Sequence, residues 1–282
     1  MTADITPLVL TFNEAPNLGR TLERLQWATK VVVLDSFSSD ETERIARSFS
    51  NVTFMQRPFD SFACQCNYGL ERISTEWVLS LDADYVLTDE LITEISRLHP
   101  DPDIAAYFVR FRYCVLGRSL RGSLYPPRAV LFRRSRGHYV QDGHAHKLEF
   151  DGLSLCLNGY IIHDDRKPLG RWLEAERKYA RKEVEKLLGN PGRARTLADR
   201  LRTWIWPAAP AAFFYTLLVK GCLFDGWPGW FYALQRTYAE LQLSLELLDR
   251  RLRQESSGSD GSRVGCAHQD QLLEPTNVVQ ET

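Results

Sequence analysis

Trp77-Val-Leu-Ser-Leu-Asp-Ala-Asp84 is the most informative stretch of this 282-residue chain. Its first five residues form a short apolar run, which predicts a buried strand. The strand ends on Asp82 and Asp84, two carboxylates one residue apart. A buried carboxylate must be paired or metal-bound, and oxygen ligands suit a hard divalent cation that can in turn hold a diphosphate. Because strands also run into Asp-rich turns, the motif alone leaves a metal site and an ordinary turn open.

Strand-like and helix-like segments alternate through the first hundred residues. The expected strands are 7–12, 30–35, 52–55 and 77–81, and the expected helices are 17–27, about 40–49, 62–73 and 88–98. Helical crossovers between short apolar strands predict an α/β fold, a mostly parallel sheet with helices on both faces. In such sheets ligands bind beyond the carboxyl ends of the strands.

Polar side chains follow three of these expected strands. Thr11, Asn13 and Glu14 follow the first, Asp35 ends the second, and the Asp82–Asp84 motif ends the fourth. Strand ends of a parallel sheet share one edge, so we expect these groups to form one site. If Asp82 and Asp84 stay extended, their side chains leave the strand on the same face.

The pattern changes after residue 100. Further strands are expected at 105–113, 129–133 and 155–162, a charged helix at 168–188 and an amphipathic helix at about 230–252. The Ser-, Gly- and Gln-rich end of the chain predicts disorder. The expected organisation is a sheet domain over 1–165, a basic and aromatic helical region over 166–253 and a disordered tail over 254–282.

Composition narrows the class of protein. The net charge is −1, so no global basic excess points to nucleic acid, and 44% hydrophobic residues are typical of a globular chain. The first residues lack the basic and apolar regions of a signal peptide. The six cysteines are scattered, which favours thiols in a reducing compartment over a disulfide framework. The expected location is the cytoplasm.

The region after residue 165 suggests contact with a membrane surface. Between Arg166 and Arg202 there are twelve Lys and Arg against five Asp and Glu, and the apolar, aromatic stretch 204–224 follows. That order suits attachment to the interface of an anionic membrane. Two prolines and a lysine make the stretch a poor spanning helix. A subdomain core or a dimer contact is the alternative.

A second set of candidates lies in Asp142-Gly-His-Ala-His146. Zinc would need a third ligand and usually a fourth, and none is evident near His144 and His146. Asp142 or a histidine instead suits a general base that takes a proton from an acceptor hydroxyl. His163 follows an apolar strand, and contact with a metal or phosphate and a structural role both stay open.

The ordered set of motifs resembles the family 2 glycosyltransferases, which adopt the GT-A fold, and looks most like the bacterial branch that builds lipopolysaccharide core and related envelope glycans. The resemblance covers about residues 5–165. It depends on four stretches, 6–14, 32–40, 67–69 and 77–84.

The resemblance implies transfer of a sugar from a nucleotide donor to a hydroxyl of an envelope glycan or glycolipid, with inversion at the anomeric carbon. Thr11, Asn13, Glu14 and Asp35 would line the nucleoside pocket. Asp82 would contact the ribose or the metal, and Asp84 would coordinate Mg²⁺ or Mn²⁺, which offsets charge on the departing diphosphate. The protein would work on the cytoplasmic face of the inner membrane, without nucleic acid.

Two positions depart from the family pattern. Cys66 stands where many relatives have Lys or Arg, so Arg72 or another residue would have to supply that charge. The second departure is at the base, where Asp142 and His146 are both candidates, and Asp142 is preferred because a carboxylate is the family's usual base.

Other functions fit the sequence less well. A sugar-1-phosphate nucleotidyltransferase would carry a glycine-rich loop after the first strand, where residues 12–17 contain no glycine. A dinucleotide-binding oxidoreductase would carry its GxGxxG motif there. An inactive, membrane-associated binding protein of the same fold is the alternative outside enzymes.

Overall fold

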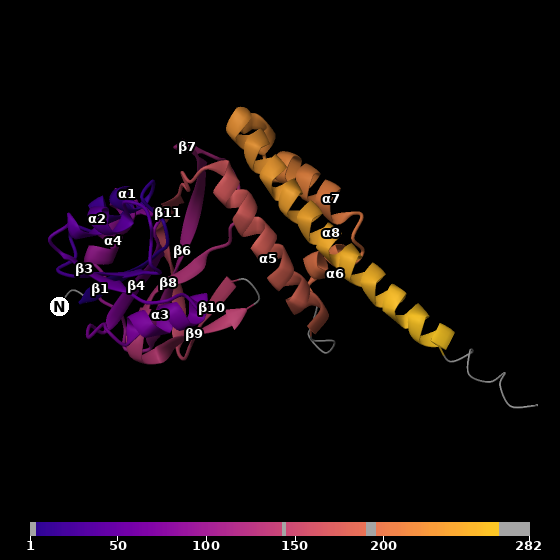
Figure 1. The fold of residues 1–282 in the computed structure, drawn as a ribbon. Helices are drawn as coiled ribbons and strands as arrows, with labels where there is room; N and C mark the ends of the chain where they lie inside the picture. The colour runs from indigo at the N-terminus through magenta and orange to yellow at the C-terminus, as the bar shows by residue number, and fades with distance from the viewer. Residues whose placement is uncertain (1–3, 143–144, 190–195, 265–282) are drawn as a thin grey trace, which may run out of the picture.

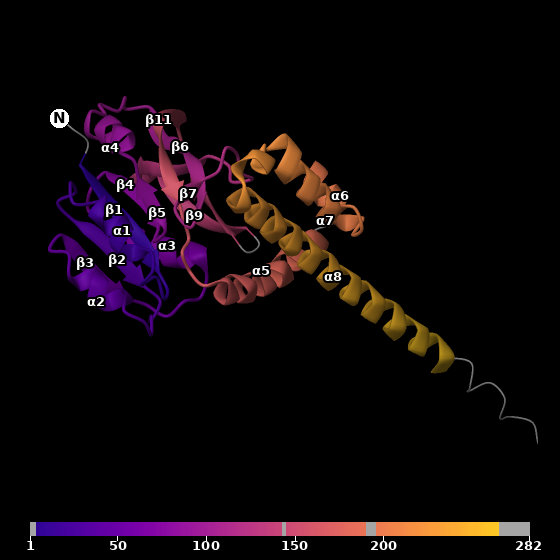
Figure 2. The same ribbon diagram turned by 90° about the horizontal axis from the view of Figure 1, so that it is seen from above.

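The computed structural model describes residues 4–142, 145–189 and 196–264. They form two parts, an α/β body and an arm of helices that begins near residue 169 and leads away from the body (Figure 1). Figure 2 shows the last helix of the arm extending well beyond the sheet. The α/β fold expected from the sequence is therefore correct, with the helices of the C-terminal region following it.

Nine of the described strands form one sheet with the order β3-β2-β1-β4-β8-β6-β11-β5, and β7 pairs with β6. The first four strands in this order are parallel to one another. These four are β1 (Ile5–Thr11), β2 (Val31–Asp35), β3 (Val52–Gln56) and β4 (Trp77–Asp82). All four were expected from the sequence.

Helices cover both faces of this parallel half (Figure 1). On one face the helices pack into a core that includes Leu22, Ala46 and Leu91. The other face packs against a single helix through Cys66 and Leu70. The first set is α1 (Leu18–Glu23), α2 (Thr42–Arg47) and α4 (Asp89–Ser96), and the second is α3 (Phe62–Leu70). Central strands buried on both sides explain the continuous apolar runs of β1 and β2.

The register of the parallel strands aligns their polar ends. Thr11 pairs with Asp35, Asp35 pairs with Gln56, and Leu10 pairs with Asp82. The carboxyl ends of four neighbouring strands therefore meet at one edge of the sheet, as the alternation of strands and helices predicts.

The second half of the sheet is mixed. β8 runs antiparallel to β4 and β6, whereas β11 runs parallel to β6. Its members are β5 (Tyr85–Leu87), β6 (Ile104–Val115), β7 (Arg118–Ser119), β8 (Arg128–Arg133) and β11 (Leu153–His163), and a separate hairpin joins β9 (Gly137–Asp142) to β10 (Ala145–Phe150). The short helix η1 (Arg134–Arg136) links β8 to this hairpin. Strands β6, β8 and β11 were expected, but β5, β7 and the hairpin were not.

The arm is built from α5 (Leu169–Gly189), α6 (Leu197–Thr203), α7 (Ala208–Phe214), the π-helical turn η2 (Tyr215–Val219), the 3₁₀ turn η3 (Cys222–Asp225) and α8 (Trp227–Val264). Val184 and Leu187 of α5 pack against Leu243 and Leu247 of α8. In the described part of the chain, no helix is both long and apolar enough to cross a membrane.

Charged side chains of the arm also pair across its helices. Arg202 binds Glu240 at 2.6 Å, and Arg236 binds Glu176 at 3.2 Å. At least one basic side chain between residues 166 and 202, that of Arg202, therefore pairs with an acidic side chain inside the arm.

The end of α8 differs from expectation. The helix ends at Val264, whereas the sequence predicts disorder from about Gln254. Extension of an existing helix avoids the cost of nucleation, so a segment with poor helix propensity can continue it. Residues 265–282 lie outside the described part.

Candidate functional site

Asp35 is a hydrogen-bonding centre at the end of β2. Its side chain is fully buried. One carboxylate oxygen accepts hydrogen bonds from the hydroxyls of Thr11 at 2.9 Å and Ser38 at 2.5 Å. The other accepts from the backbone N–H of Ser38 at 2.8 Å and from Gln56 Nε2 at 3.3 Å. Asp35 therefore holds the turn after β2 through both oxygens, at the edge where the sequence predicts the nucleoside pocket.

Asn13 ties the loop after β1 to the same turn. Its backbone φ is 54°, in the left-handed region that asparagine tolerates better than most residues. Its N–H donates to Ser38 Oγ at 2.6 Å, and its side-chain oxygen accepts from the N–H of Ser39 at 2.7 Å. The loops after β1 and β2 thus form one connected wall.

Asp82 and Asp84 do not stay on one extended face. Strand β4 ends at Asp82, and a turn takes Ala83 and Asp84 into β5. Asp82 lines a pocket, whereas Asp84 is buried and contacts His163. The expectation of a shared face fails because the strand geometry on which it depends ends one residue too early.

Asp84 and His163 form a buried pair. The Asp84 Oδ2 and His163 Nε2 atoms are 3.2 Å apart. Burial alone would raise the pKa of Asp84, but the neighbouring His163 outweighs it and the pKa lies below its usual value. Burial lowers the pKa of His163, but the charge of Asp84 outweighs burial, so the pKa of His163 lies above its usual value. Both shifts favour a charged pair.

Aromatic rings fix the orientation of His163. Its ring centroid lies 5.2 Å from that of Tyr85, 4.8 Å from Tyr113 and 4.7 Å from Tyr125. The Nδ1 atom is buried and has no hydrogen-bond partner within the described residues. The ring is therefore held by packing, with its Nε2 edge toward Asp84.

Glu14 forms an ion pair with a lysine from the segment that follows β11. Lys167 Nζ lies 2.6 Å from Glu14 Oε1 and 3.7 Å from Asp165 Oδ2. Asn17 donates to Glu14 and to Asp165, both at 2.9 Å. Burial raises the pKa of Glu14, although the Lys167 charge opposes this. The segment after β11 therefore closes over the loop after β1.

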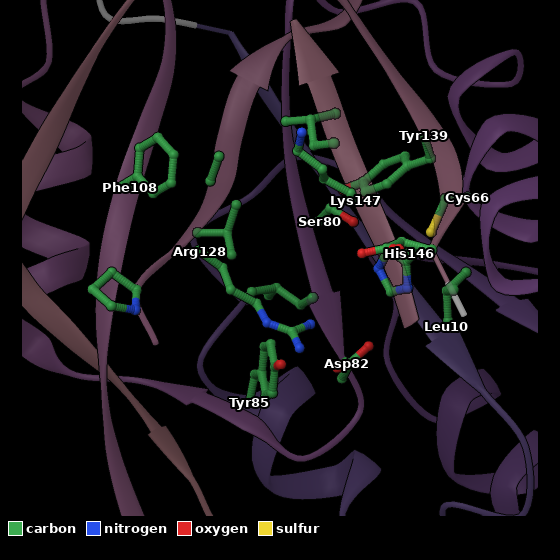
Figure 3. A pocket seen from close by; sticks show the side chains of 16 residues that line it. Leu10, Cys66, Ser80, Asp82, Tyr85, Phe108, Arg128, Tyr139, His146 and Lys147 are labelled. Atoms are coloured by element: carbon green, nitrogen blue, oxygen red, sulfur yellow. The ribbon is translucent and has the colours of Figure 1, made fainter. Parts of the chain in front are cut away.

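A pocket of about 290 Å³ opens beside Asp82. Figure 3 shows the Arg128 side chain reaching from β8 toward Tyr85 and Asp82, with the His146 ring across from it. The Arg128 guanidinium lies over the Tyr125 ring, 4.7 Å from its centroid. Arg128 was not singled out from the sequence, because only the packing of β8 beside β4 brings this cation to the pocket.

Asp142 and His146 both line this pocket. The Asp142 side chain is 43% exposed, and its Oδ1 lies 2.8 Å from Lys186 Nζ of α5. The His146 ring packs against Phe62 and Tyr139. Burial lowers the pKa of His146 although Asp82 opposes this, which favours the neutral ring. His144, also considered from the sequence, lies outside the described residues.

Cys66 faces the same pocket as a buried thiol. Burial raises its pKa, and the nearby Asp82 adds to this effect. Arg72, considered as a substitute cation, instead stacks on Tyr68 and binds Glu71. The guanidinium that lines the pocket is that of Arg128.

Comparison with known proteins identifies the family. The family model for glycosyl transferase family 2 matches residues 8–149, half of the chain, and spans β1 to β10. The chain belongs to glycosyl transferase family 2. It is a glycosyltransferase with a GT-A fold, which makes the nucleotidyltransferase and oxidoreductase alternatives wrong.

Two curated relatives are also glycosyltransferases. The lipopolysaccharide core biosynthesis glycosyltransferase LpsC of Rhizobium meliloti is 25% identical over 192 residues, 62% of this chain and 68% of the relative. The uncharacterized glycosyltransferase RP128 of Rickettsia prowazekii is 23% identical over 240 residues, 79% of this chain and 80% of the relative.

Solved structures of low sequence identity are similar as well. S. aureus TarS 1–349 in complex with UDP-GlcNAc has a TM-score of 0.42 and 13% identity, over 89% of this chain and 92% of that one. Glucosyl-3-phosphoglycerate synthase from Mycobacterium tuberculosis was solved in complex with Mn²⁺, UDP and phosphoglyceric acid. It has a TM-score of 0.44 and 15% identity, over 65% of this chain and 78% of that one.

Proposed function

We propose that this glycosyltransferase moves a sugar from a nucleoside diphosphate donor to an acceptor hydroxyl, with a divalent cation and with inversion at the anomeric carbon. The observation that carries the proposal is the Asp84–His163 pair, 3.2 Å apart, at the strand edge where Asp82 opens into a pocket. Family membership supplies the class of reaction, and this pair supplies a place for the cation.

The donor set of the pair fits a divalent cation. A carboxylate oxygen and an imidazole nitrogen face each other, and the described residues contain no cluster of three or more metal-binding side chains. A metal ligand must be a neutral imidazole, so a bound cation would replace the proton that His163 shares with Asp84. Mg²⁺ and Mn²⁺ sites commonly complete their coordination with substrate phosphates and water. Because imidazole favours softer ions than Mg²⁺, we expect Mn²⁺ to support binding better. When bound, the cation would act as a Lewis acid that offsets charge on the leaving diphosphate.

The nucleoside would lie against the wall made by the loops after β1 and β2. Asp35 acts there as a positioning residue, because its oxygens are already used by Thr11, Ser38 and Gln56. Thr11 supports that same carboxylate. Asn13 would contact the nucleoside through the loop that it shares with Ser38. Glu14 would hold Lys167 near the diphosphate.

The pocket beside Asp82 would receive the donor sugar and the acceptor hydroxyl. Asp82 would contact the ribose or the bound cation from its rim. His146 would take the proton, because its buried ring favours the neutral form that can accept one. Asp142 remains the alternative base, although its Oδ1 is held by the ammonium of Lys186 at 2.8 Å. We therefore prefer His146 to Asp142 as the base, whereas the family resemblance favours Asp142.

The acceptor would be a hydroxyl of an envelope glycan or glycolipid. The similarity to LpsC, named for lipopolysaccharide core biosynthesis, supports that class. With such an acceptor, the protein would work as a peripheral protein on the cytoplasmic face of the inner membrane.

Calorimetry with Mn²⁺ and UDP, GDP or CDP tests the proposal. We expect one nucleotide to bind wild-type protein in a metal-dependent way. Asp84→Asn and His163→Gln should each weaken this binding by about tenfold or more, because each removes one of two protein ligands. His99→Gln is the matched control, since His99 is exposed and bonds only to the carbonyl of Arg97 among described contacts. Equal affinity in EDTA would contradict the metal site.

A transfer assay tests the base. With a working donor and acceptor, His146→Gln should lower kcat by about a hundredfold or more, the usual contribution of a general base. Asp142→Asn should lower it less. The opposite order would return the role to Asp142.

A further inference from the structure

The arm carries a cluster of exposed apolar side chains where it meets the body. Phe224 is 70% exposed, Val219 69% and Leu218 61%, although η2 and η3 are well-formed turns. Six exposed side chains of the arm, together with Arg118, Arg121 and Lys220, form a surface that we call the ring face. The six are Phe214, Tyr215, Leu218, Val219, Phe224 and Trp227. A contiguous exposed apolar patch on a soluble protein usually marks a contact surface.

Three cations lie over rings of this face. The Arg118 guanidinium lies 5.6 Å from the Trp227 ring centroid, and that of Arg121 lies 5.6 Å from Phe224. Lys220 Nζ lies 5.7 Å from the Tyr215 ring. The two arginines come from the body, around β7, and the lysine from the arm (Figure 1). The ring face is therefore shared by both parts of the molecule.

The exposed charge of the ring face is positive. Asp225 lies within it, but its side chain is 6% exposed and binds the side chain of Arg121 at 3.3 Å. It also accepts from the backbone N–H of Arg121 at 3.0 Å. Its charge is thus directed into the joint between arm and body, and the cations remain at the surface.

We propose that the ring face docks into the head-group region of an anionic membrane. Aromatic rings prefer the membrane interface, and cations beside them would bind lipid phosphates. A second copy fits less well, because a two-fold contact would set the same cations against one another. The inference rests on the proposed peripheral location and names the surface that provides it.

The proposed cations differ from those expected from the sequence. The basic segment 166–202 was expected to face lipid, yet Arg181 binds Glu246 and Arg202 binds Glu240, both on α8. Arg118 and Arg121 lie before the basic segment, in the body. Docking through them would fix the sheet domain, as well as the arm, relative to the membrane.

Vesicle co-sedimentation of the full chain tests the ring face. The probes are phosphatidylcholine vesicles and vesicles of phosphatidylcholine mixed with phosphatidylglycerol. The triple variant Leu218→Ser, Val219→Ser, Phe224→Ser should lower partitioning to anionic vesicles at least about tenfold, because it removes buried apolar area. The double variant Arg118→Gln, Lys220→Gln should lower it about tenfold or more on anionic vesicles alone, since each cation contributes about 1 kcal/mol there.

Two control variants make the same kinds of substitution at exposed positions outside the ring face. Leu153→Ser with Leu155→Ser removes two exposed apolar side chains of β11, and Arg44→Gln with Arg47→Gln removes two exposed cations of α2. Neither control should change partitioning. Equal binding by the triple variant and wild type would overturn the ring face, and so would a control that weakens binding as much.

Two further measurements separate this inference from the proposed function. Nucleotide affinity in the presence of Mn²⁺ should be the same in wild type and in every ring-face variant, which also shows that the variants fold. Wild type that binds vesicles but no nucleotide would contradict the proposed reaction alone. Wild type that binds nucleotide but no vesicles would overturn the ring face. A wild-type dimer that the triple variant converts to a monomer would assign the face to a second copy and overturn the proposal too.

Discussion

At the scale of single residues, Asp35 shows how one buried carboxylate can hold the turn after a strand. Four hydrogen bonds reach its two oxygens, from Thr11, Ser38 and Gln56. Charge-assisted hydrogen bonds are the stronger kind, so the burial of this charge is compensated. The turn that carries Ser38 and Ser39 therefore keeps its shape because Asp35 accepts these four hydrogen bonds.

Asp35→Asn should destabilise the protein by about 1–3 kcal/mol, the cost of leaving a buried polar group unpaired. The new amide would point N–H groups at neighbours that are themselves donors. Urea unfolding measures the change in unfolding free energy. Asp103→Asn, at an exposed position, should leave that energy unchanged. An Asp35→Asn variant as stable as wild type would mean that the turn does not depend on the charge.

At the scale of elements, the segment between β11 and α5 assembles much of the site. His163, the last residue of β11, contacts Asp84, and Lys167 of the segment binds Glu14. Asp164 between them is buried and binds Arg20 at 3.0 Å and Arg166 at 2.8 Å. The Lys167–Glu14 and Arg20–Asp164 contacts join residues 153 and 144 positions apart along the chain, so the segment holds the first loop and helix of the sheet domain.

Lys167→Met should make stability depend more steeply on pH through Glu14. Burial raises the pKa of Glu14 to about 7 in the folded protein, above its ordinary value. Stability from such a group is full at low pH and is lost as the pH rises through the folded pKa. Without the lysine the charged carboxylate would be uncompensated, so we expect a loss of about 3 kcal/mol near pH 8 and a much smaller one near pH 5.

Thermal and urea unfolding across this range measure the effect. Lys167→Arg keeps the charge and should follow wild type. The double variant Glu14→Gln, Lys167→Met should lose the pH dependence that Lys167→Met adds, because Glu14 is no longer there to titrate. A single variant with the same loss at both pH values would show that Lys167 acts through packing instead.

The elements also show which parts of the site the sequence can predict. The ends of β1, β2 and β4 were correctly expected at one edge, because strand periodicity and the parallel crossover rule determine them. The turn at Ala83 and Asp84 was not expected, since a three-residue strand gives too short a pattern to recognise. Arg128 and Lys167 were missed because only long-range packing brings them to the site.

At the scale of the whole molecule, body and arm share one hydrophobic cluster. Val115 and Leu120 of the body pack against Leu217, Cys222 and Tyr232 of the arm. The Tyr232 hydroxyl accepts from the N–H of Leu124, and the Cys222 thiol lies 3.3 Å from the carbonyl oxygen of Gly122. A joint of this kind holds the ring face at a fixed place on the sheet domain.

Gly122→Ala should loosen that joint while the donor site keeps its shape. A Cβ atom at Gly122 would lie 2.6 Å from the carbonyl oxygen of Lys220, so backbone on one side has to move. Overpacking of this kind costs about 1–3 kcal/mol, and the loss should appear as local opening of the arm. We expect faster amide exchange in η2 and η3, with unchanged nucleotide affinity in the presence of Mn²⁺. Gly170→Ala is the control, because a Cβ atom there meets nothing within 4 Å. Unchanged exchange in Gly122→Ala would show that arm and body are held elsewhere, and weakened nucleotide binding would show that the joint also supports the donor site.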